Sequence, residues 1–69
     1  MTTLEKAQFI TNKDGLGLTI ATLAKYADYH PSTVAHYINE TRPGSDKLER
    51  AIERAIHQWR QDVIEKIKD

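Results

Sequence analysis

Apolar side chains recur along this chain at the three- and four-residue spacing of helices. The first stripe of this kind is formed by Leu4, Ala7 and Ile10. Three more stripes follow: Ile20, Leu23, Ala24 and Ala27; then Val34, Tyr37 and Ile38; and last Leu48, Ile52, Ala55, Ile56, Trp59, Val63, Ile64 and Ile67. Residues at this spacing share one face of an α-helix. The pattern therefore predicts an all-α fold of four or five helices.

Residues that cap helices stand just before several of these stripes. Thr2 and Glu5 have the spacing of a capping box, in which each side chain accepts a backbone N–H of the other residue. Thr19 and Ser45 are placed to accept backbone N–H groups at the start of the helices that follow them. These residues predict where the first, second and last helices begin.

Residues 19–40 contain two short helical patterns separated by a brief turn, which is the layout of a helix-turn-helix. Asp28 falls in the turn, and Asp tolerates left-handed backbone better than most residues. Pro31 suits the first position of a helix, because the N–H group that it lacks would have no partner there. It also directs His30 into the extended conformation of an N-cap. We therefore expect the second helix of the pair to start at Pro31.

The connection after the first helix contains two glycines and two leucines. We expect Gly15 to end the helix in a left-handed cap. Leu16 and Leu18 flank Gly17, and we expect both leucines to fill the core.

The last apolar stripe predicts a helix over residues 46–68, and a helix of that length is roughly 35 Å long. The core of so small a domain cannot cover the full length of this helix. Either the helix breaks near Arg60, or its last two turns protrude and bury Val63, Ile64 and Ile67 against a partner. In the second case these three residues form the contact of a homodimer through the C-terminal helix.

Length and composition narrow the class of protein. The 69 residues are enough for one domain, 1–69, and contain no cysteine, which fits a cytoplasmic protein. No apolar run approaches the roughly 18 residues of a membrane span, and the first residues do not form a signal peptide. The formal net charge is zero, with balanced charges in residues 1–45 and in residues 46–69. Non-specific binding to nucleic acid is therefore expected to be weak.

One face of the predicted third helix is polar. Ser32, His36 and Asn39 fall on it at i, i+4 and i+7, and Thr33 and Ala35 flank them. Ser and His can donate or accept at base edges, Ala admits a thymine methyl, and Asn can pair with adenine. The hypothesis is that this face reads bases in duplex DNA; the alternative is an ordinary solvated face.

Residues that can hold the DNA backbone lie near the same face. The predicted set comprises the N-terminal threonines of the second helix and three cations: Thr19, Thr22, Lys25, Arg42 and Lys47. Three or four cationic contacts imply a slope of roughly −3 to −4 for log affinity against log salt concentration. Each cation by itself is equally compatible with a role in solubility.

No motif in the sequence supports metal binding or catalysis. His30 and His36 point to different sides of a helix, and His57 is remote in sequence, so no metal site is predicted. The chain has no cysteine nucleophile, no readable Ser-His-acid arrangement and no glycine-rich phosphate loop. We therefore expect no enzyme activity, no cofactor and no small-molecule substrate.

Residues 18–59 resemble the lambda-repressor-like (Cro/C1, or XRE) helix-turn-helix family. The resemblance is carried by these residues: Leu18, Thr19, Leu23, Ala24, Ser32, Thr33, Val34, Asn39, Arg42, Leu48, Ile52 and Ile56. It implies a five-helix domain, often a dimeric phage or bacterial regulator. It also implies that the positions that usually meet DNA are occupied by His30, Pro31, Ser32, Ala35 and His36. Asp28 stands where the family usually has glycine.

A narrower resemblance covers the second half of the chain. Residues 37–39 and 42–44, followed by a helix that contains Trp59, are similar to the N-terminal helix-turn-helix of phage Mu-type transposition target ATPases. No Walker motif is present in this chain, so the resemblance implies only the appended DNA-docking domain.

Three functions are consistent with this reasoning. The first is a small phage or bacterial transcriptional regulator that binds duplex DNA with the helix starting at Pro31. The second is the DNA-docking module of a transposition ATPase. The third is a helix-turn-helix used for protein–protein contacts, which the neutral charge favours.

Overall fold

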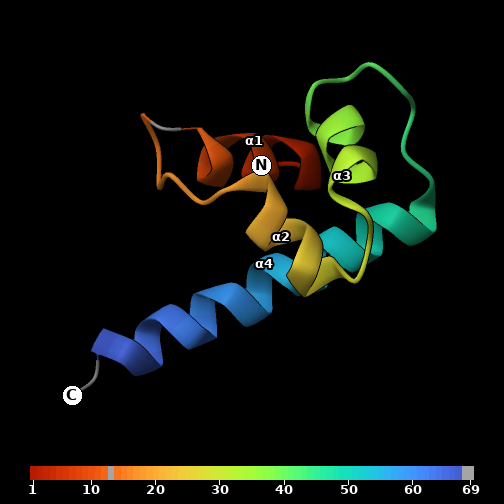
Figure 1. The fold of residues 1–69 in the computed structure, drawn as a ribbon. Coiled ribbons are helices and arrows are strands. Elements are labelled where there is room, and N and C mark those ends of the chain that lie inside the picture. The colour runs from red at the N-terminus through yellow and green to blue at the C-terminus, as the bar shows by residue number, and fades with distance from the viewer. Residues whose placement is uncertain (13, 68–69) are drawn as a thin grey trace.

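The structure, a computed structural model, describes residues 1–12 and 14–67. This part of the chain forms four helices: α1 (Thr3–Thr11), α2 (Ile20–Ala27), α3 (Pro31–Ile38) and α4 (Asp46–Ile67). No strand occurs within the two described ranges. The predicted all-α fold is confirmed, and the described residues form four helices rather than five (Figure 1).

The helix starts follow the predicted caps. The hydroxyl of Thr2 accepts the N–H of Glu5 at 3.1 Å, and the Glu5 carboxylate accepts the N–H of Thr2 at 3.0 Å, which completes the capping box. Thr19 accepts the N–H of the residue three positions on at 3.1 Å, and Ser45 does the same for Leu48 at 3.1 Å. Side-chain oxygens therefore satisfy donors that the first helical turns leave unpaired.

The turn between α2 and α3 depends on one left-handed residue. Asp28 has φ 60° and ψ 42°, in the left-handed region, and its N–H is donated to the carbonyl of Lys25 at 3.3 Å. The next N–H, of Tyr29, is donated to the carbonyl of Ala24 at 3.1 Å, which closes the end of α2. The chain then needs only two more residues before α3 starts at Pro31.

Two predictions for the connection after α1 are wrong. The left-handed glycine is Gly17, with φ +71°, whereas α1 ends at an extended Asn12. Gly15 is needed for a different reason, because a Cβ there would overlap the carbonyl oxygen of Phe9. Leu16 is 56% exposed and does not fill the core. Leu18, in contrast, packs against the core as expected.

The core lies where α2 crosses α4, with α1 and α3 completing its walls. Leu23, Val34 and Ile52 are its largest fully buried side chains, one each from α2, α3 and α4. Burying such a side chain contributes about 1.5–3 kcal/mol. Ala24 is also fully buried on α2, and its small side chain permits a close approach of the neighbouring helices.

Polar side chains of α1 connect it to the other helices. The amide of Gln8 donates to the carbonyl of Ile38 at the end of α3, at 3.0 Å. Lys6 forms an ion pair with Glu53 on α4, with 2.6 Å between Nζ and Oε1. These contacts fix α1 beside the end of α3 and the middle of α4.

Helix α4 continues without a break past Arg60 to Ile67, and residue 68 lies outside the described residues. Its C-terminal half extends beyond the other helices (Figure 1). Ile64 is 59% and Ile67 75% exposed, whereas Val63 is half-buried. Of the two expected outcomes, the structure therefore has the protruding helix. No helix of the described chain combines the length and apolar character needed to cross a membrane.

Candidate nucleic-acid interface

Helix α3 separates its side chains into a buried and an exposed face. Val34, Tyr37 and Ile38 are buried, and α3 packs on α2 and α1. The predicted base-reading residues lie on the remaining surface: His30, Pro31, Ser32, Thr33 and Asn39 are exposed, and Ala35 and His36 are half-buried. The helix is therefore anchored by its apolar side, and its polar side is open to solvent.

The N-terminal end of α3 presents an oriented imidazole. Nδ1 of His30 accepts the backbone N–H of Ser32 at 3.2 Å and lies 2.8 Å from the Ser32 hydroxyl oxygen. Because the backbone N–H is a donor, Nδ1 acts as an acceptor, so in the neutral ring the proton is on Nε2. His30 therefore caps the helix with one nitrogen and offers an N–H donor with the other.

The C-terminal end of α3 is held by the loop that follows. Nδ1 of His36 lies 2.6 Å from the hydroxyl oxygen of Thr41, whose N–H is donated to the His36 carbonyl at 3.0 Å. Glu40, with φ 58°, turns the chain back to make these contacts. Asn39 is the C-cap residue, so it lies at the far end of the helix from His30.

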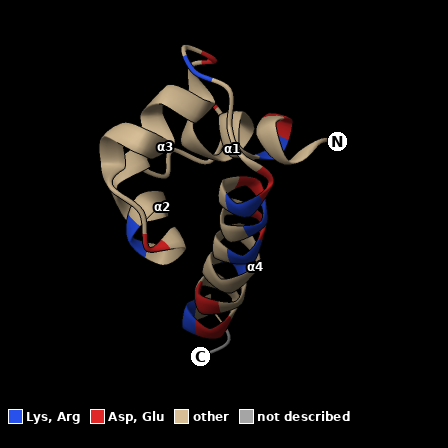
Figure 2. Ribbon diagram, turned by 90° about the vertical axis from the view of Figure 1, so that its right-hand side faces the viewer, with Lys and Arg blue, Asp and Glu red and all other residues tan. Residues whose placement is uncertain are grey.

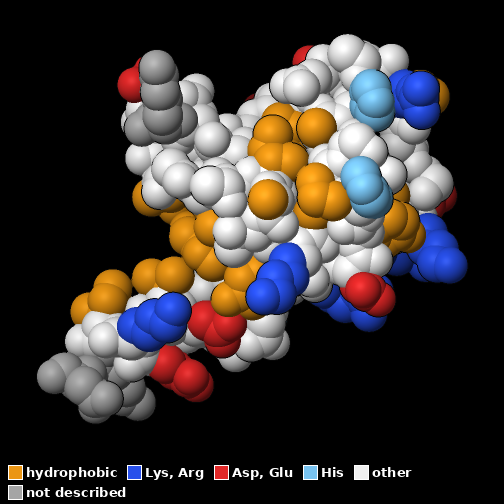
Figure 3. Space-filling view, viewed as in Figure 1, with side chains coloured by type: hydrophobic (Ala, Val, Ile, Leu, Met, Phe, Trp, Pro, Cys, Tyr) orange, Lys and Arg blue, Asp and Glu red, His pale blue; other side chains and the backbone are white. Residues whose placement is uncertain are grey.

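Few charges lie on the two helices of this motif. Figure 2 shows that α3 has no Lys, Arg, Asp or Glu, whereas α4 carries many of them. Figure 3 shows two histidine side chains over α3, with a basic side chain beside one of them. Lys25 is the one cation of α2, and Asp28 follows in the turn. Neither attraction nor repulsion of phosphates dominates this surface.

The predicted backbone-contacting residues do not form one cluster. Thr22 and Lys25 line a shallow pocket together with Tyr26. The Thr19 and Thr22 hydroxyl oxygens lie 2.7 Å apart, so these two side chains are hydrogen-bonded to each other. Arg42 lines a separate pocket with Leu4, Tyr37, Glu40, Pro43 and Gly44, and Lys47 is exposed on the first turn of α4.

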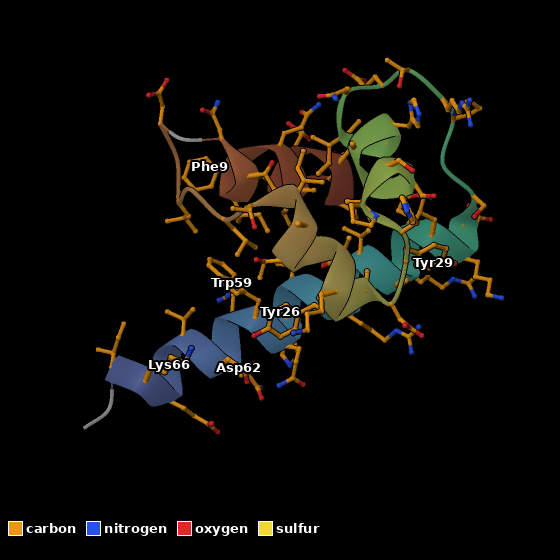
Figure 4. The ribbon with its side chains drawn as sticks, in the orientation of Figure 1. Phe9, Tyr26, Tyr29, Trp59, Asp62 and Lys66 are labelled. Carbon is orange, nitrogen blue, oxygen red and sulfur yellow. The ribbon has the colours of Figure 1, made fainter. Side chains whose placement is uncertain are left out.

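Three carboxylates of α4 are engaged inside the molecule. Lys6 and Thr3 both donate to Glu53, at 2.6 and 2.8 Å, and these hydrogen bonds lower the pKa of its carboxyl. Tyr26 donates to Asp62 at 2.6 Å, which lowers the pKa of that carboxyl and raises the pKa of the tyrosine. Tyr26 and Asp62 come from α2 and α4 and lie beside one another in Figure 4.

The third carboxylate, that of Glu49, faces the hydroxyl of the buried Tyr37 at 3.4 Å. Burial, together with the negative charge of Glu49, raises the pKa of Tyr37 to about 12. Tyr37 is thus a neutral donor at ordinary pH, and its role is to hold α3 against α4.

Two supporting residues had no signal in the sequence. Thr41 contacts His36 across a turn that depends on the positive φ of Glu40, and Glu is not a residue that predicts such a turn. Gln8 reaches the carbonyl of Ile38 from a helix 30 positions away. Both contacts depend on how distant segments pack, which periodicity and capping rules do not describe.

The described residues contain no group of three His, Cys, Asp or Glu side chains placed to hold a metal ion. What the surface offers instead is a supported polar helix with hydrogen-bonding groups at both ends. A helix presented in this way has the size and chemistry to enter a major groove.

Comparisons of this chain with models of protein families, with curated proteins and with solved structures found no match.

Proposed function

We propose that this chain is a lambda-repressor-like helix-turn-helix domain that binds duplex DNA, and that it acts as a small phage or bacterial transcriptional regulator. The observation that carries the proposal is the division of α3 into a fully packed apolar face and an exposed, uncharged polar face. A recognition helix needs both: rigid support from the domain, and polar groups free to meet base edges.

The proposed base contacts come from the first two turns of α3. The His30 Nε2–H can donate to a guanine or thymine acceptor, and the Ser32 and Thr33 hydroxyls can donate or accept. Ala35 has a side chain small enough to let a thymine methyl approach. His36 lies one turn further along the helix, where its Nε2 can meet a base edge while Nδ1 remains with Thr41.

The proposed backbone contacts are few. Lys25 and Thr22, side by side on α2, are suited to one phosphate, and Arg42 and Lys47 are suited to others. Three cationic contacts give a salt slope of about −2.7 per protomer. Affinity for random DNA is therefore expected to be modest and to depend less steeply on salt than that of proteins with about six to ten phosphate contacts.

The proposal includes a homodimer formed through the C-terminal half of α4. Ile64 and Ile67 are largely exposed there, and Val63 is half-buried beside them. Pairing of two such helix ends removes this apolar surface from water. Sedimentation equilibrium tests it: the parent chain is expected to dimerise, and Ile64→Lys is expected to be monomeric. A parent that stays monomeric at high concentration removes the dimer from the proposal.

The DNA-binding proposal is tested by fluorescence anisotropy with a labelled random duplex at low salt. Ser32→Glu places a carboxylate on the polar face of α3, and Asn12→Asp places one in the loop after α1. That loop lies away from α3 (Figure 1). Ser32→Glu is expected to weaken binding more than tenfold, and Asn12→Asp is expected to have little effect. Equal effects of the two variants, or no binding by the parent, would contradict the proposal.

A second candidate, a helix-turn-helix that contacts protein, is favoured by the exposed apolar side chains. Phe9 and Leu16 are 51% and 56% exposed, in addition to Ile64 and Ile67. Figure 3 shows hydrophobic side chains along the C-terminal half of α4 and above it. In this case amide spectra of the polar α3 positions stay unchanged when duplex is added, whereas DNA binding shifts them.

A further inference from the structure

The outward face of α4 carries a row of basic and polar side chains. Lys47, Arg50, Arg54, His57 and Gln61 follow one another at i, i+3, i+7, i+10 and i+14, and all five are exposed. At 100° per residue these positions fall within an arc of about 80°, and they extend for about 21 Å along the helix. We call this row the α4 outer face.

The acidic residues of the same helix mostly point elsewhere. Glu49, Glu53 and Asp62 are half-buried and hydrogen-bonded to other helices, as described above. In residues 1–12 and 14–67 the one ion pair is Lys6–Glu53, so no cation of the α4 outer face is neutralised in an ion pair. Asp46 and Glu65 border the row. Asp46, Glu49 and Glu53 line a hollow together with Arg50, but Glu53 is paired with Lys6, so the outer face is positive on balance.

The composition of the α4 outer face favours a polyanion over a protein partner. It contains no apolar side chain, whereas the core of a protein–protein interface needs buried aromatic or aliphatic anchors. Two guanidinium groups and an ammonium can each meet a phosphate, and the side chains of His57 and Gln61 can donate to phosphate oxygens. An extended row of this kind matches the backbone of duplex nucleic acid.

The α4 outer face and the polar face of α3 lie on different sides of the molecule. In Figure 1 α4 passes behind α2, and in Figure 2, turned by 90°, α2 and α3 lie to one side and α4 to the other. The molecule measures 40 × 24 × 22 Å. A straight duplex that lies on α3 therefore does not reach the α4 outer face beyond its first turn, where Lys47 lies.

We propose that the α4 outer face binds the phosphate backbone of a second DNA segment, so that one domain can hold two duplexes together. This site goes beyond the proposed function, because it reads no bases and shares only Lys47 with the backbone contacts proposed for DNA on α3. When α3 is not occupied by DNA, the three cations Lys47, Arg50 and Arg54 give this site a salt slope of about −2.7.

The experiment measures binding of a labelled 20-base-pair duplex to Ser32→Glu, in which α3 is blocked, as a function of salt. Two double variants are made in that background. Arg50→Gln with Arg54→Gln removes two cations from the α4 outer face, and Arg60→Gln with Lys66→Gln removes two exposed cations from other sides of the same helix. Circular dichroism confirms that each variant is folded.

The proposal expects Ser32→Glu to retain binding at low salt with a slope near −2.7. The Arg50–Arg54 double variant is expected to weaken this residual binding more than tenfold, and the Arg60–Lys66 control to change it less than threefold. Loss of all binding in Ser32→Glu, or equal effects of the two double variants, overturns the proposal. If Ser32→Glu instead binds as tightly as the parent, the proposed role of α3 fails while the α4 outer face is still tested by the double variants.

A capture assay tests the bridging step. A surface-bound duplex and a fluorescent duplex are mixed with protein that carries Ile64→Lys, which removes the proposed dimer as a source of bridging. Capture of the fluorescent duplex that is lost with Arg50→Gln and Arg54→Gln supports the second site. Capture that persists in that variant, or that never occurs with folded protein, contradicts it.

Discussion

Replacement of Asp28 by glycine is expected to stabilise the domain. The residue holds φ 60° and ψ 42° at the end of α2, and a left-handed conformation costs an L-residue about 1–2 kcal/mol, with Asp at the lower end of that range. Glycine removes this strain but loses about 0.5–1 kcal/mol more backbone entropy on folding. It also removes a negative charge from the negative end of the α2 dipole. Together, these three effects are expected to raise the free energy of unfolding by about 0.5–1 kcal/mol in Asp28→Gly.

Thermal and urea unfolding, followed by circular dichroism and by the fluorescence of Trp59, measure this difference. For a domain of this size 1 kcal/mol corresponds to a shift of about 4–8 °C in Tm, so Asp28→Gly is expected to raise Tm by a few degrees. Asp28→Val is the opposite control, because a β-branched residue strongly disfavours positive φ. Asp28→Val is expected to lower the free energy of unfolding by more than about 1 kcal/mol. A glycine variant less stable than the parent, or a valine variant of equal stability, would refute a left-handed turn at this position.

Three further predictions concern local packing. Burial and the charge of Glu49 raise the pKa of Tyr37 from its ordinary value of 10.0 to about 12. The contribution of the neutral Tyr37 to the free energy of unfolding is therefore fully present below pH 10.0 and is lost as the pH rises toward 12. Tyr37→Phe is expected to flatten this alkaline part of the profile, and an unchanged slope would count against the burial of Tyr37. Gly15→Ala is expected to destabilise the domain clearly in urea unfolding, because the new Cβ overlaps the Phe9 carbonyl oxygen, and a neutral result would show that this loop is not as close as described. Thr19→Ala removes an N-cap and is expected to cost about 1 kcal/mol, whereas Thr19→Ser, which keeps the hydroxyl, is expected to cost much less.

Local chemistry explains why the helices could be placed from the sequence. The caps at Thr2, Thr19, His30 and Ser45 act within three residues of themselves, and the apolar stripes follow the helical period. The sequence predicts that Asp28 turns the chain, and this residue does so with a positive φ. In each case the deciding interaction is short in sequence, so periodicity and residue type are sufficient to predict it.

The failed predictions have a common cause. Whether Gly15 or Gly17 takes positive φ depends on how the loop closes against α1, and Leu16 is exposed for the same reason. The sequence left open whether α4 breaks near Arg60, and its continuity is supported by Asp62, which accepts a hydrogen bond from Tyr26, 36 positions earlier. Residue type alone does not report contacts over such separations.

Sequence by itself determined that the fold is all-α, where the helices begin, and which face of α3 is apolar, because hydrogen bonds within a turn and the helical repeat are local. Only the tertiary structure decided that three carboxylates of α4 contact α1, α2 and α3, while the cations of α4 point outward and form no ion pair within the described residues. It also decided that this positive face lies on a different side from α3. The physical reason is that charge balance is a property of composition, whereas the direction in which each charge points depends on what packs beside it.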